Sequence, residues 1–533
     1  MQRWLSPKTG LWLVTALSLL AFPYHPKLRS PNELCRLWQS RALVDFGTLS
    51  INGVMKQRGP VGDLSCTATV RDHEGEKLLP CVGPEAPRGN VVAVHYYPSK
   101  APLLSFAAAP VYWVLTKVQG GQVSELSQVF WSRLFVTVLP SLLFLLLLRR
   151  FLEAYVSPAT AGLFTVVYAV GTMAFTYAET FMSHQVTAVL LFSSFYCAWR
   201  VERGEWRLRG YVLAGVAAGA AVVSEYTASL GVLCVAAYTI AARWRRWPEL
   251  AKAAGLVIAG SAPLLALLCW YHAATFGSPF VSGYKFLNDA GYMHWHQGGF
   301  LGIRVPIFAA LIHSFFSPLR GLFALSPVLA AAFFGFKAVK ERDRAVFVFL
   351  VVLVAAHTYF TSSFDHTSWG WTVGPRHLVS MVPFLFLPIA MLWEQSAGPR
   401  RAVIAGLSLT SLLAASLVGL LAYVPDTVST SVWALAMPLL SDGFFPVSWL
   451  AAWVPNPASG AVLLLLVGAL AAWLASAFWK ERVIPVVVVA VVLAHFGALR
   501  LATRYDTGDV GGLQFMESVW LAPRGVTVDF RGP

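Results

Sequence analysis

Residues 208–242 read LRGYVLAGVAAGAAVVSEYTASLGVLCVAAYTIAA, and this run decides the fold class. The run is almost uncharged, and it is too long for one helix across a bilayer, which needs about 20 apolar residues. Ser224-Glu225-Tyr226 stands in its middle, so we predict two membrane spans, 208–224 and 226–242, joined by a turn at that point. Paired apolar helices of this kind are typical of a polytopic membrane protein.

The composition of the whole chain agrees with this prediction. Of its 533 residues 57% are hydrophobic and 12% charged, and the mean hydropathy is +0.62. Soluble domains carry about 25% charged residues. The formal net charge is +14, but the chain contains no recognisable nucleic-acid-binding motif, so we expect no nucleic-acid partner. We predict an all-α polytopic membrane protein whose basic excess anchors its loops at the membrane surface.

Apolar length predicts about thirteen membrane spans in total. They are residues 9–24, 129–148, 158–175, 184–199, 208–224, 226–242, 250–273, 320–337, 344–362, 377–393, 402–423, 458–478 and 482–500. We interpret residues 1–24 as an uncleaved first span and not as a signal peptide, because no small-residue cleavage pattern ends the apolar run.

Basic residues lie between alternate predicted spans, which gives the chain an orientation. These loops contain Arg149, Arg150, Arg200, Arg203, Arg207, Arg209, Arg243, Arg245, Arg246, Lys252, Lys337, Lys340, Arg342, Arg344, Arg400, Arg401, Lys480 and Arg482. We therefore predict a protein of the cell (inner) membrane with a cytoplasmic N-terminus. Residues 25–128 form an extracytoplasmic loop, 129–500 the helical bundle and 501–533 an extracytoplasmic tail.

The large loop holds two features of its own. Residues 101–118 are apolar but contain two prolines, and counting them as a span would place Arg149 and Arg150 outside. We predict an interfacial helix there, and residues 305–319 look similar. Cys66 and Cys81 flank a short polar stretch, and the sequence leaves open whether they form a disulfide.

Ionisable groups beside a membrane are costly and so mark candidate sites. Glu33 follows the first span and is a candidate general base, although a loop carboxylate paired with Arg36 or Arg29 fits the same spacing. Lys100 precedes the interfacial helix and is either a phosphate ligand or a snorkelling lysine.

Two arginines and a polar, aromatic turn complete the candidates on this side. Arg320 and Arg376 stand at the mouths of spans and fit either a phosphate clamp or headgroup anchors. The turn 363–377 fits either a sugar-stacking surface or an interfacial belt. Asp365 and His366 in this turn could be two metal ligands, but a third and a fourth ligand are not evident. We therefore predict no metal site, and whether the protein needs a divalent cation stays open. The substrate-binding candidates are Tyr97, Asp365, His366, Trp369, Trp371 and His377.

Four short motifs resemble the GT-C superfamily of polyprenyl-phosphate-dependent membrane glycosyltransferases, with protein O-mannosyltransferases and lipid A aminoarabinose transferases as the nearest kin. The motifs are Pro31-Asn32-Glu33 with 41–47, Lys100-Ala-Pro-Leu-Leu104, Ser132-Arg133-Leu134 with Pro140, and Pro375-Arg376-His377-Leu378 with Pro383. The family usually has an acidic pair where this chain has Asn32-Glu33. The base is therefore open between Glu33 and Asp45.

The resemblance implies an inverting transfer on the extracytoplasmic face. The sugar donor is a polyprenyl-phosphate sugar, and its phosphate is bound by Lys100, Arg376 and Arg320. A lipid, glycan or protein of the cell envelope accepts the sugar, after Glu33 or Asp45 removes a hydroxyl proton. A secondary transporter is the alternative from another class, but such proteins place charges at mid-bilayer, whereas the charges here lie at span ends. A polymerase or ligase of lipid-linked glycans shares the predicted site and stays open.

Overall fold

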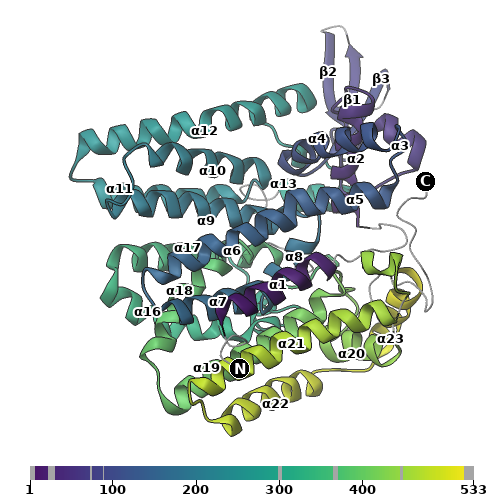
Figure 1. The fold of residues 1–533 in the computed structure, drawn as a ribbon. Coiled ribbons are helices and arrows are strands. Elements are labelled where there is room, and N and C mark those ends of the chain that lie inside the picture. Colours follow the sequence, from purple (N-terminus) through teal and green to yellow (C-terminus); the bar gives the residue numbers. More distant parts are fainter. Residues whose placement is uncertain are drawn as a thin grey trace.

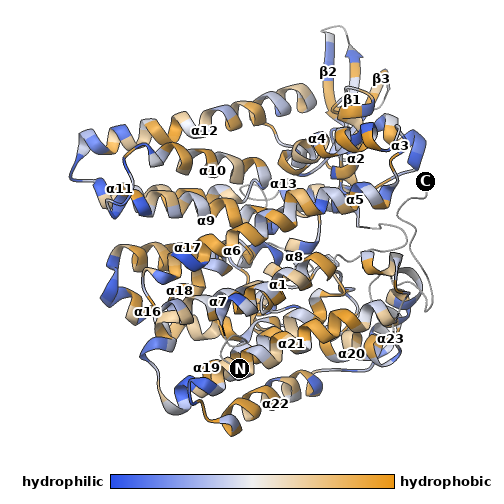
Figure 2. Ribbon diagram, in the orientation of Figure 1, coloured by the Kyte–Doolittle hydropathy of each residue, from blue (hydrophilic) through white to orange (hydrophobic). Residues whose placement is uncertain are grey.

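The structure is a computed structural model that describes residues 6–21, 30–72, 75–87, 89–297, 303–363, 370–443, 448–455 and 457–520. Most of its long helices run roughly along one direction, and the three strands stand beyond one end of them (Figure 1). Apolar residues dominate the long helices, while polar residues concentrate in the links between them (Figure 2). This is the arrangement of a mostly helical polytopic membrane protein.

Every predicted span overlaps helical structure. The corresponding elements are α1 (Pro7–Ala21), α5 (Glu125–Arg133) continuing through η1 (Leu134–Val138) into α6 (Leu139–Glu153), α7 (Pro158–Val170), α9 (Ser183–Glu202), α10 (Gly210–Ser224), α11 (Ala228–Arg243), α12 (Trp247–Phe276), α15 (Leu322–Leu325), η3 (Pro327–Ala330), α16 (Ala331–Arg342), α17 (Arg344–Ser362), α18 (Val382–Gln395), α19 (Gly398–Gly419), α21 (Ala458–Lys480) and α22 (Pro485–Leu501).

Not all of these helices are long enough to cross a bilayer alone. In the described part of the chain five helices combine sufficient length and hydropathy, namely 125–153, 247–276, 344–362, 398–419 and 458–480. Predicted span 320–337 is broken into three pieces, because Pro327 lacks the N–H that a continuous helix needs. The split predicted at Ser224-Glu225-Tyr226 is confirmed, since α10 ends at Ser224 and α11 begins at Ala228.

Shorter helices cover the end of the bundle nearest the strands and fill the links between spans. They are α2 (Pro31–Asp45), α3 (Asn52–Arg58), α4 (Leu103–Val118), α8 (Ala174–Glu179), η2 (Gly283–Phe286), α13 (Ala290–Gln297), α14 (Phe308–Phe316), η4 (Arg376–Leu378), η5 (Val432–Ala436), α20 (Met437–Ser441), η6 (Trp449–Ala452), α23 (Thr507–Phe515) and η7 (Met516–Trp520). The helix predicted over 101–118 is thus present as α4.

The large loop also contains a β-sheet, so the all-α prediction is wrong in this segment. Strands β1 (Leu64–Asp72), β2 (Gly75–Pro80) and β3 (Val91–Pro98) form an antiparallel sheet in the order β2-β1-β3. A Cys66–Cys81 disulfide joins β1 to the residue after β2. The runs Thr67-Ala-Thr-Val70 and Val91-Val92, which are rich in β-branched residues, favour strands and account for this difference from the prediction.

Close backbone approach packs α10 against α12. A Cβ atom on Gly215 would lie 2.1 Å from the carbonyl oxygen of Val257, and one on Gly260 would lie 2.1 Å from that of Val212. Small residues let two helix backbones approach this closely. Within a bilayer the hydrophobic effect does not drive helices together, so close packing of this kind is what associates them.

The basic links meet at one end of the bundle, which we call the basic end. Arg243 at the end of α11 pairs with Glu202 at the end of α9 at 2.7 Å, and Tyr155 after α6 donates to Asp343 before α17 at 2.8 Å. The opposite end of the bundle, where α9 begins and α10 ends, carries the loop helices and the sheet; we call it the site end. The structure thus brings these helix ends together, and the side of the membrane that the basic end faces stays a prediction.

Candidate functional site

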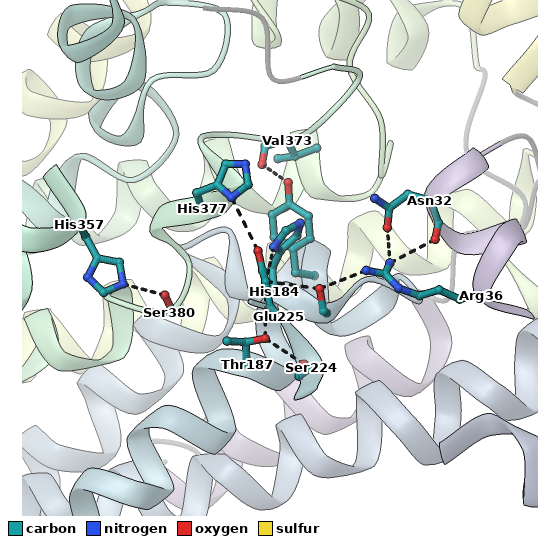
Figure 3. A network of polar contacts seen from close by, with 12 residues as sticks. Asn32, Arg36, His184, Thr187, Ser224, Glu225, His357, Val373, His377 and Ser380 are labelled. Atoms are coloured by element: carbon teal, nitrogen blue, oxygen red, sulfur yellow. Dashed lines mark hydrogen bonds and ion pairs between the residues drawn. The ribbon is translucent and has the colours of Figure 1, made fainter. Parts of the chain in front are cut away.

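A polar pocket lies at the site end, where six parts of the chain converge. Its volume is about 30 Å³, which is room for about one water molecule. It is lined by Asn32, Arg36, Lys100, Ala101, Ser183, His184, Ser224, Glu225, Tyr226, Tyr284, Arg376 and His377. Figure 3 shows part of this network around Glu225.

Helix α2 supplies one wall of the pocket. Ser30 caps the helix, since its hydroxyl accepts from the N–H of Glu33 at 3.4 Å, and Pro31 occupies the first turn. Asn32 and Arg36 are four residues apart and so share one face of the helix. An Arg36 Nη1–H donates to the Asn32 carbonyl oxygen at 3.1 Å and also to its side-chain oxygen, while Nη2–H donates to the Ser183 hydroxyl at 3.3 Å.

Lys100 enters the pocket from the segment between β3 and α4. Its Nζ lies 3.0 Å from Asp63 Oδ1, and it stands over the Tyr284 ring at 5.6 Å from the centroid. Asp63 also accepts from the Ser99 hydroxyl at 2.8 Å and from Asn32 Nδ2 at 3.1 Å. Asp63 has φ +60°, a left-handed conformation that aspartate tolerates better than most residues. The lysine is therefore held in place by a carboxylate that is itself positioned by hydrogen bonds from Ser99 and Asn32.

The charges of this pair are stabilised against burial. Burial disfavours the Lys100 ammonium, but Asp63 outweighs that effect, and the pKa of Lys100 is raised. Burial likewise disfavours the Asp63 carboxylate, but Lys100 and the Ser99 hydrogen bond prevail, and the pKa of Asp63 is lowered. Both groups are charged at neutral pH.

The turn between α10 and α11 places Glu225 in the pocket. Its Oε2 accepts from the Ser183 hydroxyl at 3.3 Å and lies 2.9 Å from His184 Nδ1. Its Oε1 lies 3.6 Å from His377 Nδ1. Burial favours the neutral acid, but the contacts with His184 and His377 outweigh it and hold the pKa of Glu225 well below its ordinary value. The pocket thus contains an ionised carboxylate oriented by two imidazoles.

Two guanidinium groups in this pocket have unsatisfied N–H groups. The Nε atoms of Arg36 and Arg376 are buried and have no hydrogen-bond partner within the described part of the protein. The same holds for His184 Nε2. A buried polar atom without a partner is rare and costs about 1–3 kcal/mol, so such atoms in one pocket mark a place for a ligand. An anion would satisfy both arginines.

Glu33 lies outside this pocket, in a separate buried cluster. It is 0% exposed, and Arg133, also 0% exposed, donates to it from Nε at 2.9 Å and from Nη2 at 2.8 Å. The Phe181 N–H donates at 2.5 Å, and the Tyr423 hydroxyl donates as well. Both carboxylate oxygens are thus occupied by protein donors. The role of Glu33 as the base stays a prediction.

The remaining predicted residues divide into four groups. Lys100, Arg376 and His377 all line the pocket, so the structure brings these three together. Asp45 lies at the far end of α2, where it accepts from the Tyr112 hydroxyl at 2.8 Å; twelve residues of helix separate it from Glu33 by about 18 Å. Asp365, His366 and Trp369 lie outside the described residues.

Three further candidates pack elsewhere. Tyr97 is buried in an aromatic cluster with its ring 5.7 Å from that of Phe276. Arg320 Nη1–H donates to the Gly370 carbonyl oxygen at 2.7 Å, and its Nη2 lies 2.5 Å from Asp426. Trp371 packs edge-on against the Phe515 ring at 4.6 Å. None of the three lines the pocket, and their substrate contacts stay predictions.

The comparisons with known proteins bear on the overall fold. No family model and no curated protein matches the chain. The fold is similar to that of ArnT from Cupriavidus metallidurans. The apo structure of that protein matches with a TM-score of 0.48 and 14% identity over 93% of this chain and 78% of ArnT. Its structure bound to undecaprenyl phosphate matches with a TM-score of 0.45 and 13% identity over 92% and 77%.

These matches carry no argument about the chemistry of this protein, which has to be argued from its own residues. Within the described part of the chain no three His, Cys, Asp or Glu side chains converge as a metal ion would require.

Two carboxylates of the site, Glu225 and Asp63, are not among the predicted site residues. Glu225 stands out in the sequence as a charge that interrupts the apolar run 208–242, but the predicted chemistry gives it no role. Asp63 gave no such signal, because it stands among polar loop residues, and only the fold brings it to Lys100.

Proposed function

We propose that this protein transfers a sugar from a polyprenyl-phosphate donor to a hydroxyl group of a cell-envelope acceptor. The observation that carries the proposal is the pair of unsatisfied guanidinium Nε–H groups, on Arg36 and Arg376, in the pocket that also holds Lys100. Arginine presents a planar fork of donors that matches phosphate oxygens, and lysine adds a point charge.

The charge balance of the pocket fits a phosphodiester. Arg36, Arg376 and Lys100 contribute three positive charges, and Asp63 and Glu225 contribute two negative ones. With both histidines neutral the pocket carries one net positive charge. A polyprenyl-phosphate sugar is a phosphodiester with one negative charge, so its binding neutralises the site.

The same groups suit the chemical step. The acceptor oxygen attacks the anomeric carbon, its proton passes to a base, and the bond from that carbon to the phosphate oxygen breaks with inversion. The leaving phosphate gains a negative charge, which Lys100 and the two arginines stabilise because they are already in place.

We assign the base to Glu225. It is ionised, and its Oε1 faces only His377 among the described residues, at 3.6 Å. Oε2 is engaged by His184 and Ser183, which fixes the carboxylate as a positioned base requires. The cavity of about 30 Å³ is too small for a sugar phosphate, so the pocket has to widen when the donor binds.

The location of the charges supports a transferase over a secondary transporter. The pocket lies where helices begin and end, beside the loop helices and the sheet, whereas transporters place their binding groups at mid-bilayer. The Cys66–Cys81 disulfide, in the sheet at the same end of the bundle, fits an oxidising, extracytoplasmic face. We therefore propose that the site end faces outward.

The test uses purified full-length protein in lipid nanodiscs with a radiolabelled polyprenyl-phosphate sugar and a membrane extract as the source of acceptor. We expect wild-type protein to transfer label. Lys100→Ala and Arg376→Ala are expected to weaken binding of undecaprenyl phosphate at least tenfold, since each removes a charge-assisted contact. Lys117→Ala, on the exposed end of α4, is the matched lysine control and should bind normally.

Glu225→Gln separates binding from chemistry. It is expected to bind undecaprenyl phosphate at least as tightly as wild type, because it removes a negative charge from the pocket, and to transfer sugar at least a hundredfold more slowly. Undiminished transfer by Glu225→Gln would refute the assigned base. Equal donor binding by wild type, Lys100→Ala and Arg376→Ala would refute the phosphate site.

A further inference from the structure

A second cavity lies between α6 and α9 at the basic end of the bundle. Its volume is about 590 Å³, within the range of small-molecule sites. It is lined mainly by Leu147, Arg150, Tyr196, Cys197, Arg200 and Trp206. His184, at the start of α9, lines the site-end pocket, and sixteen residues of helix separate it from Arg200, or about 24 Å. The two cavities are therefore on opposite sides of the bundle.

Arg200 is fixed at the mouth of this cavity. Its Nη1–H donates to the Tyr196 hydroxyl at 3.3 Å, and its guanidinium stands 5.6 Å from the centroid of the Trp206 ring. The turn after α9 folds back, because the Trp206 N–H donates to the Arg200 carbonyl oxygen at 3.2 Å. Tryptophan and tyrosine rings at the rim are typical of the membrane–water interface.

The mouth carries an excess of positive charge. Glu205 is shared between Arg200 at 2.8 Å and Arg203 at 2.7 Å, so one carboxylate balances two arginines. Arg149 is paired with Glu153 at 2.7 Å. Within the described part of the chain its neighbour Arg150 has no ion-pair partner, and it is exposed. An anion is the complementary ligand.

The apolar surface next to the cavity identifies the kind of anion. Leu143 and Leu146 are 67% and 51% exposed, and with Arg150 they follow a spacing of three and four residues along α6. Residues at this spacing form one stripe on a helix. An acyl chain lying on the two leucines would place its phosphate beside Arg150.

We propose that this cavity binds the headgroup of an anionic phospholipid from the leaflet at the basic end. The phosphate contacts Arg150 and Arg200, the rings of Tyr196 and Trp206 flank the glycerol region, and an acyl chain follows Leu143 and Leu146. Basic pockets between membrane helices bind anionic headgroups in this way. The site is independent of the sugar-transfer proposal, because it shares no residue with the other pocket.

The test measures lipid retention by the full-length protein. Protein is purified from nanodiscs of equal parts phosphatidylglycerol and phosphatidylcholine, and the lipids that remain after dilution into detergent are quantified by mass spectrometry. We expect wild type to retain phosphatidylglycerol preferentially. Arg150→Gln and Arg200→Gln should each lower its apparent affinity about fivefold. Arg150 is exposed, so its replacement leaves the fold intact.

Arg400→Gln is the control, since Arg400 is another exposed arginine at the basic end but lies outside the cavity. The proposal is overturned if phosphatidylcholine is retained equally, or if Arg400→Gln loses as much phosphatidylglycerol as Arg150→Gln. A third arm adds inorganic phosphate at millimolar concentration. Full displacement of the lipid by phosphate alone would show a soluble-anion site and would also overturn the proposal.

Discussion

Replacing Glu33 with glutamine is expected to destabilise the protein strongly. The glutamate accepts from Arg133, from the Phe181 N–H and from the Tyr423 hydroxyl, and both partners of the ion pair are 0% exposed. Glutamine has an NH2 group in place of one carboxylate oxygen. This group donates hydrogen bonds and would face the N–H and O–H donors that now bind Glu33. The substitution also leaves the buried guanidinium without a counter-charge. Loss of one partner of a buried ion pair costs about 3–5 kcal/mol, and we expect Glu33→Gln to lose that much free energy of unfolding.

The assay is denaturant unfolding of the purified protein in detergent micelles, followed by tryptophan fluorescence. Glu225→Gln serves as the comparison, because that carboxylate is partly accessible to the pocket and should affect transfer far more than stability. A Glu33→Leu/Arg133→Leu double variant should be more stable than the sum of its single variants predicts, since it removes both buried charges together.

Two outcomes would refute this reasoning. If Glu33→Gln unfolds at the wild-type denaturant concentration and binds undecaprenyl phosphate normally but fails to transfer sugar, Glu33 acts in the chemistry and its cluster is not structural. Normal stability of Glu33→Gln together with normal transfer would show that the pair contributes to neither.

Three more outcomes follow from described contacts. Cys81→Ser opens a disulfide that spans fifteen residues and should lower the free energy of unfolding by about 3 kcal/mol, which limited proteolysis of the sheet would reveal as faster cleavage. The pKa of Lys100 is raised and that of Asp63 is lowered, so we expect donor affinity to be constant from about pH 5 to pH 9. Affinity should fall at alkaline pH, when Lys100 loses its proton, and at acid pH, when Asp63 gains one. In a binding titration Asp63→Asn should move the alkaline loss of affinity to lower pH, because Lys100 then lacks its carboxylate partner. Gly215→Ala should cost about 1–3 kcal/mol in unfolding experiments, whereas Gly468→Ala, where a Cβ meets open space, should be nearly neutral.

The helical layout could be predicted from the sequence because length and hydropathy are local properties. The turn at Glu225 followed from the same rule, since a charge cannot lie in the middle of an apolar helix without cost. Lys100 and Arg376 were placed on one face by counting spans, and they do share a pocket. The count of spans itself was less secure, because several helices are short and one predicted span is broken.

The partners of each charge could not be predicted in the same way. Glu33 and Arg133 are 100 residues apart, and Arg320 and Asp426 are 106 apart, so only the packed bundle decides that they meet. From these four residues the sequence singles out Glu33 and Arg320 as costly groups near the membrane. It could not distinguish those that neutralise one another from Arg36 and Arg376, whose Nε–H groups are left for a ligand.

The Glu33 cluster also has a consequence for biosynthesis. Its donors come from α5, from the link between α8 and α9 and from Tyr423 after α19, which the ribosome makes nearly four hundred residues later. During synthesis the N-terminal helices therefore enter the membrane with one hydrogen-bonding position on Glu33 unfilled. The last third of the chain completes it, so a truncated or stalled chain would expose an incompletely satisfied carboxylate to the insertion machinery and to quality-control proteases.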